Sequence, residues 1–218
     1  MTDYIVHNIN YNTFLLLPQK CLFWENQKTL VLADLHFGKT GHFRKNGIGV
    51  PQSIFKEDMQ RLLSLIQYFK PQNVLIIGDL FHSDANKEHV FFVRWRKDIA
   101  RVNVQLVLGN HDVLDTQWYK GAGIDLFEEK FTLNNFCFIH DIIKPELAGD
   151  IYTFCGHLHP AVKITGQGKQ SLRLPCFYFS EHYAVLPAFG NFTGTHIIHP
   201  KKGDAVFVIA EKKVIQIK

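Results

Sequence analysis

The stretch TLVLADLH at residues 29–36 decides the fold, because its pattern returns as NVLIIGDLFH at residues 73–82 and as NVQLVLGNHD at residues 103–112. Each stretch begins with a short, mostly apolar run, and an acidic or amide side chain follows that run. Runs of this length and composition are typical of strands that are buried on both faces. We expect the first of these strands to end at Asp34.

The segments between these three stretches predict helices. From Pro51, a plausible first-turn residue, apolar side chains recur at helical spacing. They are Phe55, Met59, Leu62, Leu63, Ile66 and Phe69. A second helix is expected over about residues 87–100. The order strand, helix, strand, helix, strand favours parallel pairing with the helices packed outside.

The remaining segments predict further strands. TFLLL and CLFW precede the deciding stretch, and five strand-like segments fill the second half. These five are NNFCFIHD, DIYTFCGH, the region around PCFYFSEHYAVLP, DAVFVIA and VIQI. They indicate a second, antiparallel or mixed sheet packed on the first. We therefore expect an α/β fold, a two-sheet β-sandwich flanked by helices (αββα), and a single domain over residues 1–218, since no linker or repeat interrupts the chain.

The composition is that of an ordinary soluble protein. A net charge of +4 tolerates a polyanionic partner without requiring one. The four cysteines form no CxxC pair and lie in apolar segments, which predicts buried, reduced thiols. No signal peptide is visible, and the apolar runs fall short of the ~20 residues that span a bilayer. We expect a cytoplasmic protein without a membrane partner.

Histidine is abundant, with 12 residues, and histidine is the commonest metal ligand. Five short motifs follow predicted strands and should meet at one edge of a sheet. They are DLH (Asp34, His36), GDLFH (Asp79, His82), GNHD (Asn110, His111, Asp112), IHD (His140, Asp141) and GHLH (His157, His159). Imidazole, carboxylate and amide donors together suit Mn²⁺, Fe or Zn²⁺ better than Ca²⁺ or Mg²⁺.

The spacing within these motifs supports a metal site. Asp34 and His36 are two residues apart, so in an extended segment their side chains leave the same face, as do those of His157 and His159. Asp79 follows Gly78, where the missing side chain would let backbone and metal approach closely.

The order DxH, GDxxx, GNHD, H, GHxH resembles that of the calcineurin-like metallophosphoesterases. The resemblance implies two divalent transition-metal ions, with Mn²⁺ favoured. It implies one ion held by Asp34, His36, Asp79 and His159, and the other by Asp79, Asn110, His140 and His157. Asp79 would bridge the two ions. His111 would reach the substrate, and Asp112 would orient the imidazole of His111. Whether His111 protonates the leaving group or stabilises charge stays open.

Three segments extend the resemblance over nearly the whole chain. LADLHFGKTGHFRKNGIGVP, GDLFHS and LPAFGNFTGTH are similar to the bacterial ligase-associated DNA damage response phosphoesterases. Those proteins are described as endonucleases and are associated with an ATP-dependent DNA ligase, a helicase and an exonuclease. The resemblance implies a DNA endonuclease in repair, with a hydroxide activated by two metals attacking phosphorus in line. One departure is His82, where many relatives carry Asp or Asn.

Two questions stay open at this point. The basic residues Lys39, His42, Arg44 and Lys45 follow the DLH motif and form either a solvated loop or a loop that grips phosphates. The substrate is DNA in the leading hypothesis. The alternatives are a small nucleotide or cyclic phosphodiester and, outside the enzymes, a non-catalytic scaffold.

Overall fold

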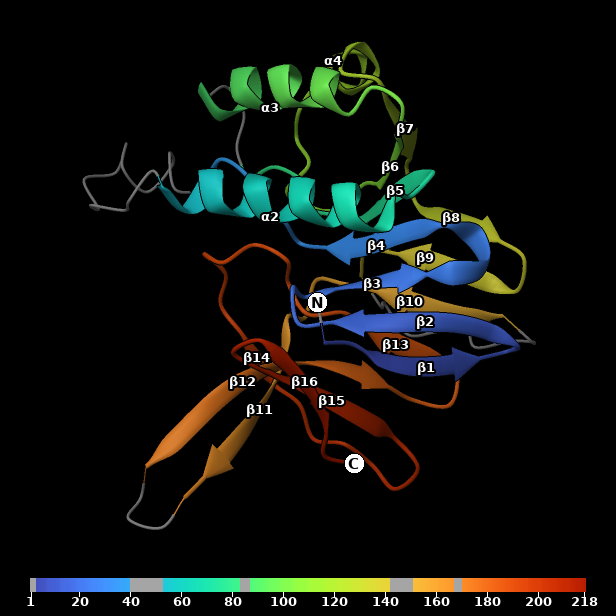
Figure 1. The fold of residues 1–218 in the computed structure, drawn as a ribbon, viewed down its shortest axis with the longest axis vertical. Coiled ribbons are helices and arrows are strands. Elements are labelled where there is room, and N and C mark those ends of the chain that lie inside the picture. The colour runs from blue at the N-terminus through green and yellow to red at the C-terminus, as the bar shows by residue number, and fades with distance from the viewer. Residues whose placement is uncertain (1–2, 40–52, 83–86, 142–150, 167–169) are drawn as a thin grey trace.

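The computed structural model describes residues 3–39, 53–82, 87–141, 151–166 and 170–218 (Figure 1). Pro51 and three residues of the basic stretch, His42, Arg44 and Lys45, lie outside these ranges.

The first sheet contains seven strands in chain order. They are β1 (Ile5–Ile9), β2 (Asn12–Leu17), β3 (Cys21–Trp24), β4 (Thr29–Ala33), β5 (Asn73–Ile77), β6 (Asn103–Val107) and β7 (Ile124–Phe127). Pairing is antiparallel from β1 to β4 and parallel from β4 to β7. In the parallel part, Ala33 pairs with Ile77 and Ile77 with Val107, so three strands end level with one another. This register brings three of the five motifs to one edge.

Helices connect the parallel strands, and the first two of them agree with the sequence-based prediction. They are α2 (Ser53–Phe69), α3 (Lys87–Asp98) and the short α4 (Thr116–Gly121), and a turn of 3₁₀ helix, η1 (Glu25–Gln27), precedes β4. All three α-helices lie on the outer side of the first sheet (Figure 1). The apolar face of α2, which includes Phe55, Leu62 and Ile66, packs there on a core built with Leu30, Leu32, Val74 and Ile76 of the strands.

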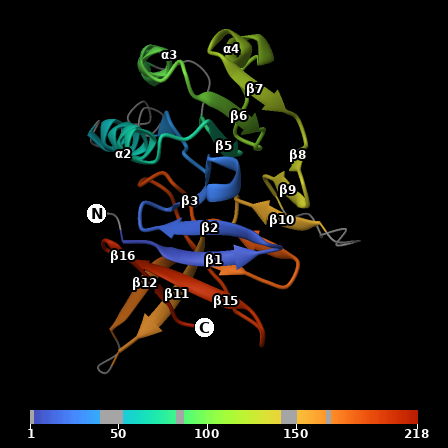
Figure 2. The ribbon, with the colours of Figure 1, turned by 45° about the vertical axis from the view of Figure 1, so that its right-hand side comes forward.

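The second sheet is mixed and comes from the second half of the chain. Its strands are β8 (Lys130–Leu133), β9 (Phe136–Ile139), β10 (Tyr152–Cys155), β11 (Pro160–Thr165), β12 (Ser171–Phe179), β13 (Tyr183–Val185), β14 (His196–Ile197), β15 (Ala205–Ala210) and β16 (Lys213–Gln216). The order is β14-β11-β12-β13-β10-β9-β8, with β15 paired to β12 and β16 to β15. Strands β11 and β12 extend beyond the sandwich as an arm (Figures 1 and 2).

The two sheets pack face to face over an aromatic core, which confirms the predicted sandwich (Figure 2). The rings of Phe138 and Phe154 stack at 5.4 Å and 11°. Trp24 contacts Phe14 and Phe136, and its indole N–H donates to Asn12 at 2.9 Å. Aromatic side chains bury large apolar areas and therefore dominate such a core.

Among the described residues, the outer face of the second sheet carries no helix, only a small apolar cluster that includes Cys176, Val162 and Val208. All four cysteines are free thiols, and three of them are buried, as expected. No helix in the described part of the chain has the length and apolarity needed to cross a bilayer.

Some elements lack a sequence signal strong enough to predict them. Strand β1 alternates exposed and buried residues around His7 and Asn8, and α4 has only six residues. Strands β7, β8 and β11 carry charged or polar residues on their exposed sides. These elements are formed by pairing with neighbours distant in sequence, which local propensity does not encode.

The packing gives a stability prediction. Phe154 is fully buried and stacks on Phe138 between the sheets. Phe154→Ala should lower the free energy of unfolding by about 3–5 kcal/mol, the usual cost of such a cavity. Urea denaturation in the presence of a chelator measures this change as a shift of the midpoint. Leu172→Ala, on the exposed end of β12, is the control and should leave the midpoint nearly unchanged. Equal shifts for both variants would show that the core is not where the sheets meet.

Candidate metal centre

The residues after the strand ends turn sharply through the left-handed region. Asp34, His36 and Asp79 have φ values of 55°, 49° and 49°, and His157 and His159 have values of 63° and 51°. Each such residue costs on the order of 1–2 kcal/mol, because its Cβ crowds the following carbonyl. Strain of this kind persists where the surrounding structure imposes it, and it gathers at functional sites.

This backbone corrects one sequence-based argument. We expected the pairs Asp34/His36 and His157/His159 to converge because an extended backbone alternates its side chains. Asp34 and His36 do meet in one group, and His157 and His159 fall in the two neighbouring groups, but neither segment is extended. The loop of the first pair is held by hydrogen bonds to its neighbour, from Asp34 N to Gly78 O at 3.2 Å and from His36 N to Asp79 O at 2.8 Å.

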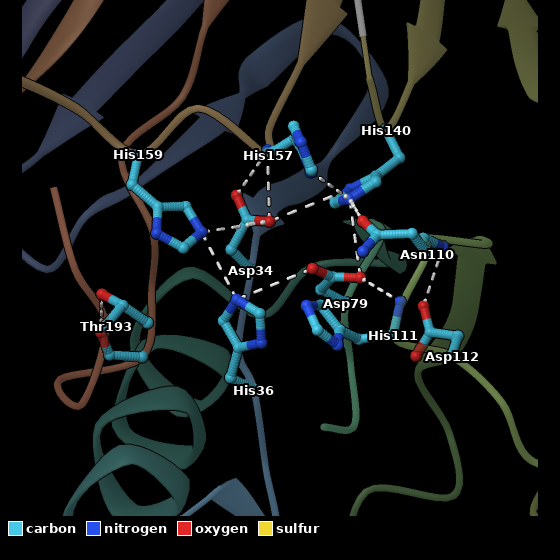
Figure 3. Close-up of polar contacts among 12 residues, drawn as sticks. Asp34, His36, Asp79, Asn110, His111, Asp112, His140, His157, His159 and Thr193 are labelled. Carbon is cyan, nitrogen blue, oxygen red and sulfur yellow. Dashed lines mark hydrogen bonds and ion pairs between the residues drawn. The ribbon is translucent and has the colours of Figure 1, made fainter. Parts of the chain in front are cut away.

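The first group of potential metal ligands consists of Asp34, His36 and His159 (Figure 3). Nε2 of His159 lies 3.3 Å from Nε2 of His36 and 3.5 Å from Oδ1 of Asp34. The other ring nitrogen of His159, Nδ1, lies 3.1 Å from the carbonyl of Gly194. Since a carbonyl only accepts, this contact fixes the proton on Nδ1 and leaves a lone pair on Nε2 facing the group.

The second group consists of Asp79, His140 and His157, with Asn110 beside it. Nε2 of His140 lies 3.0 Å from Oδ1 of Asn110, 3.5 Å from Oδ1 of Asp79 and 3.2 Å from Nδ1 of His157. The carbonyl of Ile77 lies 3.3 Å from Nδ1 of His140. This contact fixes the proton on Nδ1 and leaves the lone pair of Nε2 facing the second group. Backbone carbonyls such as those of Ile77 and Gly194 carry no sequence signal, because every residue has one.

Asp79 lies between the two groups (Figure 3). Its Oδ2 is 3.6 Å from Nε2 of His36, and its Oδ1 is 3.5 Å from Nε2 of His140. One carboxylate oxygen therefore faces each group. Asp34 also approaches both groups, since its Oδ1 lies 3.5 Å from Nε2 of His159 and 3.8 Å from Nδ1 of His140. Its Oδ2 accepts from the backbone N–H of His157 at 2.9 Å.

The donor set fits divalent metal ions. The lone pair on Nε2 of His140 points at two oxygens that are themselves acceptors, those of Asn110 and Asp79. A cation among them turns this repulsion into coordination. Burial, with the neighbouring charge of Lys39, lowers the pKa of His36 to about 2, so this imidazole is neutral, the form that binds metal. Nitrogen and oxygen ligands together suit first-row transition metals.

The site is buried at its base and open at one side. Asp34, His36, Asp79 and His140 are buried, whereas Asn110 and His157 are exposed. A groove of about 350 Å³ runs along the open side of the second group. Its walls include Leu108, Glu129, Ile139 and Asp141 together with Asn110, His140 and His157. The second group therefore borders a groove on this side.

His111 lies against the site without belonging to either ligand group. Its backbone N–H donates to Oδ1 of Asp79 at 2.9 Å, and its ring centroid is 5.4 Å from that of His36. The ring of His82 packs on His111 at 4.6 Å and 34°. His82 thus supports the ring of His111, a role that its motif position alone does not reveal.

Asp112 differs from its predicted role. The sequence predicts that its carboxylate orients the ring of His111, but in the described structure the carboxylate contacts other groups. It accepts from the N–H of Gly109 at 2.9 Å and of Phe81 at 3.1 Å, and from the hydroxyl of Tyr119 at 3.4 Å. Burial raises the pKa of Asp112 to about 7. The short side chain turns back on the loop that carries His111 and fixes its backbone instead.

Lys39 is the one residue of the predicted basic stretch within the described part of the chain. It is partly buried, burial lowers its pKa, and the charge of Asp79 acts against that lowering. The contribution of His42, Arg44 and Lys45 stays a prediction.

Gly78 is required, although not for the predicted reason. A Cβ at this position would lie 2.0 Å from Nδ1 of His140, and φ is +71°. The missing side chain therefore makes room for a ligand imidazole and not for the metal itself.

This geometry gives a prediction with a matched control. Gly78→Ala should displace His140 and remove the ion of the second group. Gly123→Ala has nearly the same φ, +70°, but its added Cβ has no neighbour closer than 3.7 Å. In this control, the free energy of unfolding should therefore fall only by the backbone strain, about 1–2 kcal/mol, and the metal content should not change. Elemental analysis after gel filtration measures bound metal, and equal metal contents in the two variants would contradict the role of Gly78.

Comparison with known proteins agrees with this geometry. The family model for calcineurin-like phosphoesterases matches residues 27–205. The crystal structure of Pseudomonas putida nuclease MPE superimposes with a TM-score of 0.82 and 27% sequence identity, over 99% of this chain and 100% of that one. A second solved structure, a protein of unknown function from Aquifex aeolicus, superimposes with a TM-score of only 0.43. It is 16% identical over 65% of this chain and 82% of its own, and it supports no argument.

No curated protein matches the chain. The family match covers most of the sequence and includes the edge where the two ligand groups meet. The chain belongs to the calcineurin-like phosphoesterase family and is a hydrolase that acts on phosphate esters.

Proposed function

We propose that the chain is a two-metal phosphodiesterase that cuts DNA. The observation that carries the proposal is the position of Asp79, whose two carboxylate oxygens face the two ligand groups. A carboxylate can bridge two cations and an imidazole cannot. We assign one ion to Asp34, His36, Asp79 and His159, and the other to Asp79, Asn110, His140 and His157. Mn²⁺ is the ion that we favour, on the mixture of donors.

DNA as substrate is supported by likeness to a nuclease. The solved protein with 27% identity over nearly the full length of both chains is named a nuclease. The groove beside Asn110 and His157 is open to solvent at the side of the second group. We extend the proposal to DNA repair, in association with a DNA ligase, a helicase and an exonuclease, on the sequence resemblance described above.

When bound, two cations would supply Lewis acidity and would lower the pKa of a water molecule to near neutrality. The protein's own residues complete the chemistry. Asp34 and Asp79 keep the two ligand groups in a fixed relation from the buried base of the site. We assign the contact with the phosphate group to His111, whose N–H donates to Asp79 and whose ring packs on that of His82. It either donates a proton to the leaving oxygen or stabilises charge on the phosphate.

Salt dependence separates DNA from the alternative substrate class. Neutralising backbone phosphates makes the affinity for DNA fall steeply with salt. A small nucleotide or cyclic phosphodiester has no flanking phosphates and should show little dependence. Turnover with Mn²⁺, measured against single-stranded DNA, duplex DNA and a minimal diester at several salt concentrations, tests the proposal. A preference for the minimal diester with a flat salt dependence would contradict DNA as substrate.

Asp79→Ala tests the two-metal arrangement. The wild-type protein should bind two transition-metal ions per chain. The variant should lose affinity at both sites, because each group loses a carboxylate oxygen. Isothermal titration with Mn²⁺ measures both stoichiometry and affinity. Asp98→Ala, at an exposed helix end, is the control and should bind as the wild type does. Two tightly bound ions in Asp79→Ala would refute a bridging role.

His111→Ala tests the substrate contact. The variant should keep its metal content but lose about 10²–10⁴-fold in kcat, the usual contribution of one acid–base group. The loss should shrink for esters with good leaving groups if the imidazole protonates the leaving oxygen. His182→Ala, half-exposed and beside the exposed Glu181, is the control. Loss of a metal ion from His111→Ala would instead make His111 a ligand.

A further inference from the structure

One segment, residues 188–194, contacts two of the three members of the first ligand group. Ala188 bridges to Ala33, the last residue of β4. The N–H of Phe189 donates to the carbonyl of Ala33 at 2.8 Å, and that of Gly190 donates to the carbonyl of Asp34 at 3.1 Å. At the other end, the carbonyl of Gly194 lies 3.1 Å from Nδ1 of His159. The segment thus borders both Asp34 and His159.

The fit of this segment against the strand end is tight. A Cβ on Gly190 would lie 2.4 Å from the carbonyl oxygen of Leu35, between the two ligands Asp34 and His36. Thr193 closes the turn by donating its hydroxyl to the carbonyl of Gly190 at 3.1 Å (Figure 3). A small shift of the segment would therefore be passed on to the backbone of Asp34 and to the ring of His159.

Helix α2 holds the segment from the opposite side. The guanidinium of Arg61 donates to the carbonyl of Phe189 and covers the Phe189 ring, with its carbon 4.1 Å from the centroid. Arg61 pairs with Asp58 one turn earlier at 2.9 Å. The second carboxylate oxygen of Asp58 accepts from the N–H of Asn191 at 3.1 Å. Asp58 is 3% exposed, so this ion pair is anchored below the surface.

We infer that Arg61 and Asp58 are positioning residues for the ion of the first ligand group. They act through residues 188–194, which fix the strand end that carries Asp34 and the tautomer of His159. Neither side chain belongs to a ligand group. The inference rests on the proposed two-metal arrangement. It adds that binding of the ion at the first ligand group depends on the Arg61–Asp58 pair of α2, which lies outside that group. Partners that orient metal ligands are typically worth about 10–100-fold in metal affinity.

The test compares Arg61→Met with Arg96→Met in the full-length protein. Arg96, on α3, also donates to backbone carbonyls, those of Ile99, Val102 and Gly123, at 3.0–3.1 Å. None of Ile99, Val102 and Gly123 belongs to either ligand group. Both substitutions should destabilise the fold, which thermal melting in chelator measures. Only Arg61→Met should weaken one Mn²⁺ site, by about 10–100-fold in Kd by isothermal titration.

Double variants identify which ion is affected. His140→Ala should weaken Mn²⁺ binding at the second group and leave binding at the first group unchanged. Adding Arg61→Met should then weaken binding of the remaining ion by about the factor seen in the single variant. His159→Ala weakens the first group, so Arg61→Met should then change the remaining affinity little. Asp58→Asn keeps an oxygen for the N–H of Asn191 but loses the charge facing Arg61. It should show a smaller loss than Arg61→Met at the same site.

The outcomes are distinguishable. Fewer than two ions in the wild-type protein would refute the proposed two-metal function, and the positioning role with it. Two ions in the wild type with unchanged affinities in Arg61→Met would refute the positioning role alone. Equal losses of Mn²⁺ affinity in Arg61→Met and Arg96→Met would be explained by general destabilisation. That outcome would also refute the positioning role.

Discussion

Two buried carboxylates, those of Asp34 and Asp79, are the constraint on which the rest of this structure depends. Both are almost fully shielded from solvent. Removing a charge from water costs several kcal/mol unless opposite charge and hydrogen-bond donors replace the solvent. Here the N–H groups of His157 and His111 and a ring of imidazoles supply part of the replacement. Divalent ions held by the two ligand groups would supply the remainder.

The local geometry follows from that constraint. To turn imidazoles and carboxylates inward at one edge, the chain adopts left-handed conformations at Asp34, His36, Asp79, His157 and His159. The strain is concentrated within a few residues, next to a rigid framework of strands that end in register. The sandwich core, with its stacked Phe138 and Phe154, makes that framework stiff. Stability of the core and precision of the site are thus properties of the same packing.

Much of the fold could be predicted from the sequence, as could the gathering of the motif residues at one edge. Buried parallel strands read as continuous apolar runs, and the motifs at their ends name Asp34, Asp79 and His140 directly. What the sequence does not show is the direction of a side chain after the strand ends. Asp112 turns to the amides of Gly109 and Phe81, and Gly78 makes room for His140. Both depend on neighbours from distant segments.

The contact between Gly194 and His159 has a consequence for the order in which the site is completed. His159 is the last ligand that we assign, yet the carbonyl that fixes its tautomer belongs to a residue that follows it by more than thirty positions. During synthesis, all the proposed ligands leave the ribosome before the segment that aligns two of them. The first ligand group can therefore be aligned only after strands β8–β13 and residues 188–194 have been synthesised, while β14, β15 and β16 are still to follow.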